Sequence, residues 1–196
     1  MTPKADAIKR SMHRLRRYRI AEKGLQPHFI TWTVEEWLPV FVSDSYCQLI
    51  TDSLEYCRQQ KGLLVHAYVV MPTHVHAVIS AEPGTDLSEI LRDSRKHTSK
   101  EIVRQVRADG LTLFDWVFRD AARKAGRPAG AYKVWQDGFH PETLESEKFF
   151  LQKLEYLHNN PVRKGLVGKP EYWWHSSAGS YILREEGPLE LDILDH

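Results

Sequence analysis

The pattern of hydrophobic and polar positions divides the chain into a series of strands and helices. Residues 29–34 (FITWTV) are rich in aromatic and β-branched side chains, which is typical of a strand. Between Asp44 and Gln60, apolar residues recur every three or four positions, which is the spacing of one helix face. Gly62 then follows as a helix stop signal. These segments predict a strand followed by a helix with one buried side.

Two strands with a very short connection are expected next. Residues 63–71 (LLVHAYVVM) form an almost continuous apolar run, which is typical of a strand buried on both faces. The run is interrupted at Pro72-Thr73 and resumes over residues 74–80 (HVHAVIS). Because such a short connection leaves no room for a crossover, we predict an antiparallel hairpin.

The second half of the chain contains two further helical patterns. One begins after Asp86, with Glu89 three positions on as in a capping box, and its apolar stripe continues to Val106. Residues 107–135 are less regular, and the Gly-, Pro-, Ala- and Arg-rich stretch 121–131 predicts a flexible loop. The last helix is predicted from about Ser146 to Asn160, where Pro161 is expected to stop it.

This order of elements predicts an α+β fold, with a ferredoxin-like antiparallel sheet and packed helices. With 196 residues, of which 42% are hydrophobic and 27% charged, the chain suits a single domain. We predict that domain over residues 25–183, between a basic N-terminal arm (1–24) and an acidic C-terminal tail (184–196). No apolar run approaches the roughly 18 residues of a membrane helix, so no membrane partner is expected.

Charge is unevenly distributed behind the net value of +1. The arm holds eight Lys and Arg residues against two acidic ones, which favours a local contact with a polyanion. A solvated tail is the more common role of a charge run. Cys47 and Cys57, on one predicted helix, would lie roughly 15 Å apart, too far for a disulfide. Together with a charged N-terminus that lacks an apolar leader, this favours a cytoplasmic protein.

The first candidate for chemistry is His74-Val75-His76 on the second strand of the hairpin. Alternate strand residues share a face, so both imidazoles project together while Val75 points into the core. Two imidazoles placed in this way can hold one metal ion. For an isolated motif, two histidines on a polar sheet face are the more common explanation.

The second candidate is a face of the last helix. Phe150, Leu154 and Leu157 form its apolar stripe, and Tyr156 lies about 200° from Leu154 around the helix axis. Asn160, one turn later, shares the face of Tyr156. Burial therefore does not explain Tyr156, and a functional residue and a surface tyrosine are equally compatible with this pattern. Aromatic residues such as Trp135, Tyr172 and Trp174 could stack on bases, although they more often pack in a core.

Together these segments resemble a known family. Residues 71–79 (MPTHVHAVI) resemble the HUH motif, histidine–hydrophobic–histidine, of single-tyrosine transposases. Residues 154–167 (LEYLHNNPVRKGLV) are similar to the tyrosine-helix signature of the REP-associated tyrosine transposases, and residues 134–140 and 170–177 are similar to further blocks of that family. The chain departs from the family at Thr73, where many relatives have Asn, and at Pro141, where an acidic residue is expected.

The resemblance implies a catalytic domain that cuts and rejoins single-stranded DNA beside hairpins, as a monomer or homodimer. It implies that His74, His76 and Asn160 bind Mg²⁺ or Mn²⁺, and that Tyr156 is the nucleophile of a 5′-phosphotyrosine intermediate. From the arm, the helices and the signature, we expect DNA contacts from basic residues: Arg14, Arg16, Arg17, Arg95, Lys96, Lys153 and Arg163.

Other functions are compatible with the same residues. One is a DNA hairpin-binding protein without catalysis, and another is a metal-dependent nuclease that uses water, with Tyr156 incidental. The intact set of His74, His76 and Tyr156 argues against the binding protein, and trapping a covalent protein–DNA adduct would separate the transposase from the nuclease. A purely structural protein is disfavoured, because it does not require Tyr156 and Asn160 on a helix face away from the core.

Overall fold

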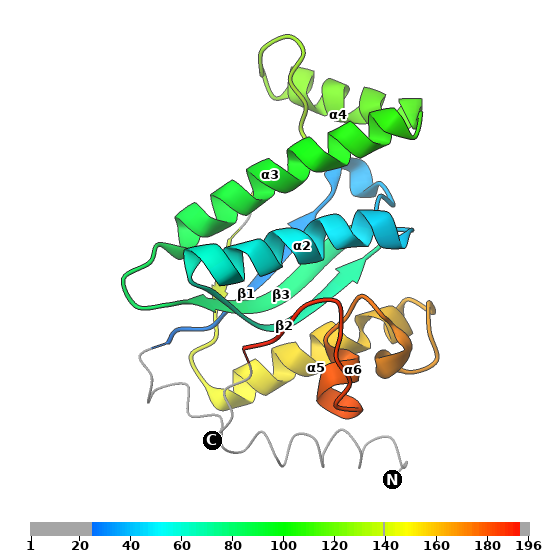
Figure 1. The fold of residues 1–196 in the computed structure, drawn as a ribbon. Coiled ribbons are helices and arrows are strands. Elements are labelled where there is room, and N and C mark those ends of the chain that lie inside the picture. Colours follow the sequence, from blue (N-terminus) through cyan, green and yellow to red (C-terminus); the bar gives the residue numbers. More distant parts are fainter. Residues whose placement is uncertain (1–24, 139, 193–196) are drawn as a thin grey trace.

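The computed structural model describes residues 25–138 and 140–192 (Figure 1). Its sheet has the order β2–β3–β1–β4, and neighbouring strands are antiparallel. The strands are β1 (His28–Thr33), β2 (Leu63–Met71), β3 (His74–Ala81) and the two-residue β4 (Glu142–Thr143). Helix α2 (Asp44–Lys61) connects β1 to β2, and α3 (Leu87–Ala108) follows β3. The predicted ferredoxin-like α+β fold and the β2–β3 hairpin are confirmed.

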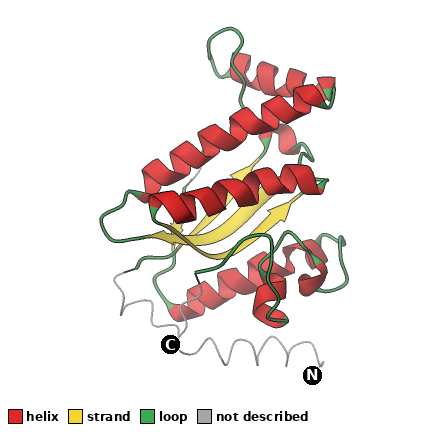
Figure 2. Cartoon of the chain, in the orientation of Figure 1, coloured by secondary structure: helices red, strands yellow, loops and turns green. Residues whose placement is uncertain are grey.

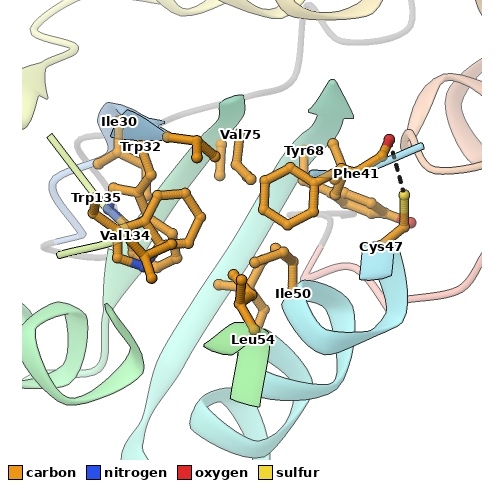
Figure 3. Packing of buried hydrophobic residues seen from close by; sticks show 14 of the residues in the cluster. Ile30, Trp32, Phe41, Cys47, Ile50, Leu54, Tyr68, Val75, Val134 and Trp135 are labelled. Atoms are coloured by element: carbon orange, nitrogen blue, oxygen red, sulfur yellow. Dashed lines mark hydrogen bonds between the residues drawn. The ribbon is translucent and has the colours of Figure 1, made fainter. Parts of the chain in front are cut away.

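Helices cover both faces of the sheet (Figure 2). Helices α2 and α3 lie on one face, and α5 (Glu147–Arg163) with the short α6 (Ala178–Ile182) lies on the other. The larger core fills the α2/α3 face, where Trp32, Val75 and Trp135 pack near Ile50 and Leu54 of α2 (Figure 3). A smaller apolar cluster lies beneath α5: Phe29, Ala67, Val69, Met71, Val78, Leu144, Phe150, Leu154 and Leu157. Trp135 is thus a core residue and not a base-stacking one.

Local signals place the helix ends where the sequence predicts them. The carboxylate of Asp86 accepts hydrogen bonds from the backbone N–H groups of Ser88 (2.8 Å) and Glu89 (3.3 Å), which caps α3. Gly62 ends α2 in the left-handed conformation, with φ 68°. Cys47 and Cys57 are both free and buried in α2, as their spacing predicts. Within the described residues, no helix is both long and apolar enough to cross a membrane.

The prediction of irregular structure over residues 107–135 is partly wrong. This segment contains helix α4 (Thr112–Lys124). Val117, Phe118 and Ala122 form the buried side of this helix, but Leu113 and Trp116 are exposed on its outer side. The apolar stripe of this helix is therefore wider than the side that the fold buries. The predicted loop over 121–131 accordingly begins only after Lys124.

The prediction that Pro161 ends the last helix is also wrong. Helix α5 continues to Arg163, with Pro161 buried inside it. Proline removes only its own N–H, while the backbone bonds from Lys164 N–H to the Asn160 carbonyl (3.0 Å) and from Leu166 N–H to the Pro161 carbonyl (2.9 Å) are kept. The chain leaves the helix at Gly165, whose φ of 71° is left-handed.

The C-terminal part of the chain covers the free edge of β2. The Val70 N–H donates to the His175 carbonyl (2.8 Å), and the Ser177 N–H donates to the Tyr68 carbonyl (2.9 Å). Further along, the carboxylate of Asp192 accepts a hydrogen bond from the Val65 N–H (2.9 Å). The described part of the predicted acidic tail is thus attached to the sheet, whereas the predicted arm 1–24 lies outside the described residues. Covering an edge strand protects it from pairing with other chains.

Gly62→Ala should lower the free energy of unfolding by about 1–2 kcal/mol, because alanine is strained in the left-handed conformation. The added Cβ would also lie 3.0 Å from both Glu82 Oε2 and Thr85 Cγ2. Urea denaturation followed by circular dichroism measures the loss. Gly84→Ala is the control, since Gly84 also has a positive φ but no atom within 4 Å of the position that a Cβ would occupy. A loss no larger than that of the control would contradict the steric part of this prediction.

Candidate active site

The two histidines of the HUH-like motif lie side by side on β3. His74 and His76 are opposite Thr33 and Thr31 of β1, and their ring centroids are 4.6 Å apart. Both are buried on the face that α5 covers, while Val75 between them packs in the core of the α2/α3 face. The predicted sharing of one face by the two imidazoles is confirmed.

Threonine hydroxyls orient both rings. Thr31 Oγ1 lies 2.8 Å from His76 Nδ1, and Thr73 Oγ1 lies 2.9 Å from His74 Nδ1. Thr73, which departs from the family pattern, thus holds one of the histidines. The other ring nitrogen of His76, Nε2, is buried without a hydrogen-bond partner. A buried nitrogen of this kind is suited to bind a ligand that the protein itself does not provide.

Both histidines are held in the neutral form. Burial lowers the pKa of His74 to about 4, with a smaller contribution from the positive charge of Lys164. Burial also lowers the pKa of His76 to about 3, helped by His74 and Lys153. Neutral imidazole is the form that binds metal ions, so the two rings are ready to bind one at neutral pH.

Helix α5 brings Tyr156 next to the histidines. The ring centroid of Tyr156 lies 5.5 Å from that of His76 and 6.1 Å from that of Phe29, in edge-on contacts. The side chain is 39% exposed, so solvent and a substrate can reach it. The guanidinium of Arg163, which contributes positive charge, lies 5.7 Å from the Tyr156 ring centroid.

Asn160 is buried one helical turn beyond Tyr156, and its Nδ2 has no hydrogen-bond partner. In the described part of the chain, no three His, Cys, Asp or Glu residues form a group that could hold a metal ion. A further protein ligand beside the two histidines must therefore be of another type, and the side-chain amide of Asn160 fits this requirement. Two imidazoles and an amide oxygen are compatible with several divalent metals.

The predicted DNA-contact residues are divided by the fold. Lys153, which pairs with Glu142 and lies 4.6 Å from the Phe29 ring centroid, and Arg163 are on α5 near Tyr156. Arg95 and Lys96 are on α3, across the sheet from the histidines, and Arg95 donates to the Gln136 carbonyl (2.8 Å). Arg14, Arg16 and Arg17 lie outside the described residues.

Two residues near the histidines are absent from the sequence-based prediction. Lys164 is close enough to His74 to lower its pKa. Its position, four residues after Asn160, would have placed it on the face of Tyr156 had the helix been predicted to pass Pro161. Trp37 contacts His74 edge-on, with ring centroids 6.0 Å apart, and no local pattern indicates this contact.

Comparisons with known proteins show which proteins this chain is similar to. The family model for IS200-like transposases matches residues 22–111. A Haemophilus influenzae protein described as uncharacterized is 30% identical over 105 residues, which cover 50% of this chain and 54% of that protein, so the chain matches only about half of this relative. The REP-associated tyrosine transposase of Escherichia coli is 18% identical over 143 residues, covering 73% of this chain and 71% of that protein.

A solved structure of a REP-associated tyrosine transposase bound to a REP hairpin has the same fold. It superimposes with a TM-score of 0.58 and 18% identity, covering 87% of this chain and 88% of that one. The family match over residues 22–111 includes the HUH-like motif. Over residues 22–111 the chain therefore resembles the IS200-like transposases, and over most of its length it resembles the REP-associated tyrosine transposases.

Proposed function

We propose that this protein cleaves and rejoins single-stranded DNA through a covalent bond between Tyr156 and a 5′-phosphate. The observation that carries the proposal is the contact between Tyr156 and His76, whose ring centroids are 5.5 Å apart although the two residues are far apart in the sequence. A nucleophile beside paired neutral imidazoles is an arrangement suited to phosphoryl transfer.

The proposed reaction proceeds as follows, with the proton of the tyrosine hydroxyl given up as the 3′-oxygen gains one. The Tyr156 hydroxyl oxygen attacks the scissile phosphorus, the bond from phosphorus to the 3′-oxygen breaks, and a 3′-hydroxyl leaves. The phosphate then remains on the tyrosine as a 5′-phosphotyrosine. Rejoining reverses these steps, with a 3′-hydroxyl attacking and the tyrosine leaving. Because one phosphodiester replaces another, no nucleotide cofactor is needed.

His74, His76 and Asn160 would hold the metal ion that such a reaction uses, Mg²⁺ or Mn²⁺. Their suitability rests on the buried Nε2 of His76, which has no hydrogen-bond partner, and on the side-chain amide of Asn160, which would offer its oxygen. When bound, the divalent cation would withdraw negative charge from the phosphate and orient it. Thr31 and Thr73 would keep the imidazole rings in place.

We assign hairpin-associated single-stranded DNA as the substrate. The supporting observations are the basic residues beside Tyr156 and the REP hairpin named for the solved relative. Arg163, Lys164 and Lys153 would contact phosphates near the reacting bond, because they lie beside Tyr156 and the histidines. Arg95 and Lys96 stay predictions for a contact elsewhere on the DNA, since they lie across the sheet.

The proposal is tested with the full-length protein and a DNA hairpin that carries single-stranded flanks and a label at its 3′ end. With Mg²⁺ or Mn²⁺, a labelled band at the size of the protein should appear on a denaturing gel, and EDTA should remove it. Cleavage without this adduct would favour a nuclease that uses water. Hairpin binding without cleavage would favour a binding protein.

Deleting residues 1–20 should weaken hairpin binding and flatten its salt dependence. The deleted arm carries six basic residues between Lys9 and Arg19, and each phosphate contact releases counterions. The slope of log Kd against log salt should fall by up to about 4. Changing Arg14, Arg16 and Arg17 together to Gln should lower it by about 2 without shortening the chain. An unchanged slope in both variants would show that the arm does not contact DNA.

A further inference from the structure

An exposed tryptophan lies at the edge of the histidine pair. Trp37 ends η3 (Glu35–Trp37), a single helical turn directly after β1. Its side chain is 58% exposed, and its ring centroid lies 6.0 Å from that of His74 at an interplanar angle of 76°. The indole and the imidazole of the proposed metal ligand therefore meet at a steep angle, while much of the indole surface is open to solvent.

The backbone holds this indole outward in an unfavourable conformation. Glu36 and Trp37 have φ values of 52° and 54°, in the left-handed region that non-glycine residues rarely adopt. The burial of an apolar ring would normally compensate for such strain, but Trp37 is mostly exposed. Strained residues of this kind cluster at ligand sites, where the surrounding structure enforces them.

Contacts of the residues before and after Trp37 hold this turn in its strained conformation. Glu35 forms a buried ion pair with Lys133, and its N–H donates to the Val134 carbonyl (2.8 Å). The Trp37 N–H donates to the Val34 carbonyl (3.0 Å), and the Phe41 N–H donates to the Pro72 carbonyl (3.0 Å) next to the HUH-like motif. The turn is thus attached to the strand connection that carries His74, which fixes the indole relative to the histidines.

We propose that Trp37 stacks on an unpaired base of the DNA strand at the active site. An exposed indole offers a flat apolar surface to any base, and stacking of this kind is tolerant of sequence. Because the ring contacts His74, the stacked base belongs to the nucleotide at the scissile phosphate or to its neighbour. Trp37 would thereby hold the strand in register for attack by Tyr156. This inference rests on the proposed function.

The test compares binding in a Tyr156→Phe background, so that the DNA is not cut. The probe is a fluorescein-labelled DNA hairpin with about ten unpaired nucleotides on each side of the stem, and fluorescence anisotropy gives the Kd. Trp37→Ala should weaken binding about 5- to 150-fold, while Trp37→Phe, which keeps an aromatic ring, should restore most of the affinity. Trp116→Ala is the matched control, because Trp116 is a tryptophan of similar exposure (62%) on α4 that the inference does not use.

A scan with abasic nucleotides identifies the stacked base. Removing that base should weaken DNA binding by the Tyr156→Phe parent, which keeps Trp37, but should have little further effect on binding by the Trp37→Ala variant. Removing a base at any other position should weaken binding by both proteins equally. Equal affinity of Trp37→Ala and its parent, or an equal loss in Trp116→Ala, would overturn the inference. So would a scan in which no position depends on Trp37.

The outcomes separate this inference from the proposed function. If the protein with Tyr156 forms the adduct but Trp37→Ala binds and cuts like its parent, only the stacking role fails. If Trp37→Ala shows the expected loss but no adduct ever forms, the DNA contact stands and the proposed chemistry fails. Absence of any binding to the hairpin probe would overturn both.

Discussion

Tyr156→Phe should abolish both strand cleavage and the covalent adduct, while hairpin binding and the free energy of unfolding change little. The substitution removes only the hydroxyl oxygen that would attack phosphorus. Tyr156 is 39% exposed, and its ring contacts with His76 and Phe29 can be kept by phenylalanine. No other group then supplies the attacking oxygen at the same phosphorus, so a complete loss is expected.

The measurement uses DNA labelled on the 3′ side of the cut, since that fragment carries the 5′-phosphate. The parent protein should give a labelled protein band, and Tyr156→Phe should give none. Tyr172→Phe is the control, because Tyr172 is an exposed tyrosine on η4 (Pro170–Tyr172) that the proposal does not use. An adduct that survives in Tyr156→Phe and disappears in Tyr172→Phe would move the nucleophile to Tyr172.

Replacing His74 and His76 together by Ala should reduce metal-dependent cleavage at least about a hundredfold. A divalent cation supplies several kcal/mol of charge stabilisation in such reactions, and each 1.36 kcal/mol corresponds to about a tenfold change in rate. The double variant removes the two imidazoles whose ring centroids lie 4.6 Å apart on this face. Titration calorimetry with Mn²⁺ should show the parallel loss of metal binding.

The control for the double variant is His97→Ala, which removes an exposed histidine of α3 on the other side of the sheet. It should cleave like the parent protein. Circular dichroism separates lost chemistry from lost folding, since Ala at two buried positions leaves space beneath α5. Unchanged metal-dependent cleavage in a folded double variant would contradict the assignment of these histidines.

Features with a local cause could be predicted from the sequence alone. The shared face of His74 and His76 follows from the two-residue period of a strand, and the structure confirms it. The position of Tyr156 off the apolar stripe follows from the helical period, and the residue is indeed partly exposed. Gly62 and Asp86 mark helix ends because capping involves only a few neighbouring residues.

Features that depend on packing between distant segments were decided by the tertiary structure. Helix α5 passes through Pro161 because the following backbone bonds and the burial of this residue outweigh a local penalty, and this places Lys164 near His74. The basic face of α3 is a local pattern, but only the arrangement of the layers shows that Arg95 and Lys96 lie across the sheet from Tyr156. The contact of Trp37 with His74 depends on a strained turn that long-range hydrogen bonds hold in place. The hydrophobic pattern of the sequence cannot predict such bonds. The hydrophobic period of a helix or strand shows which of its sides is apolar. The element against which that side packs depends on the fold of the whole chain.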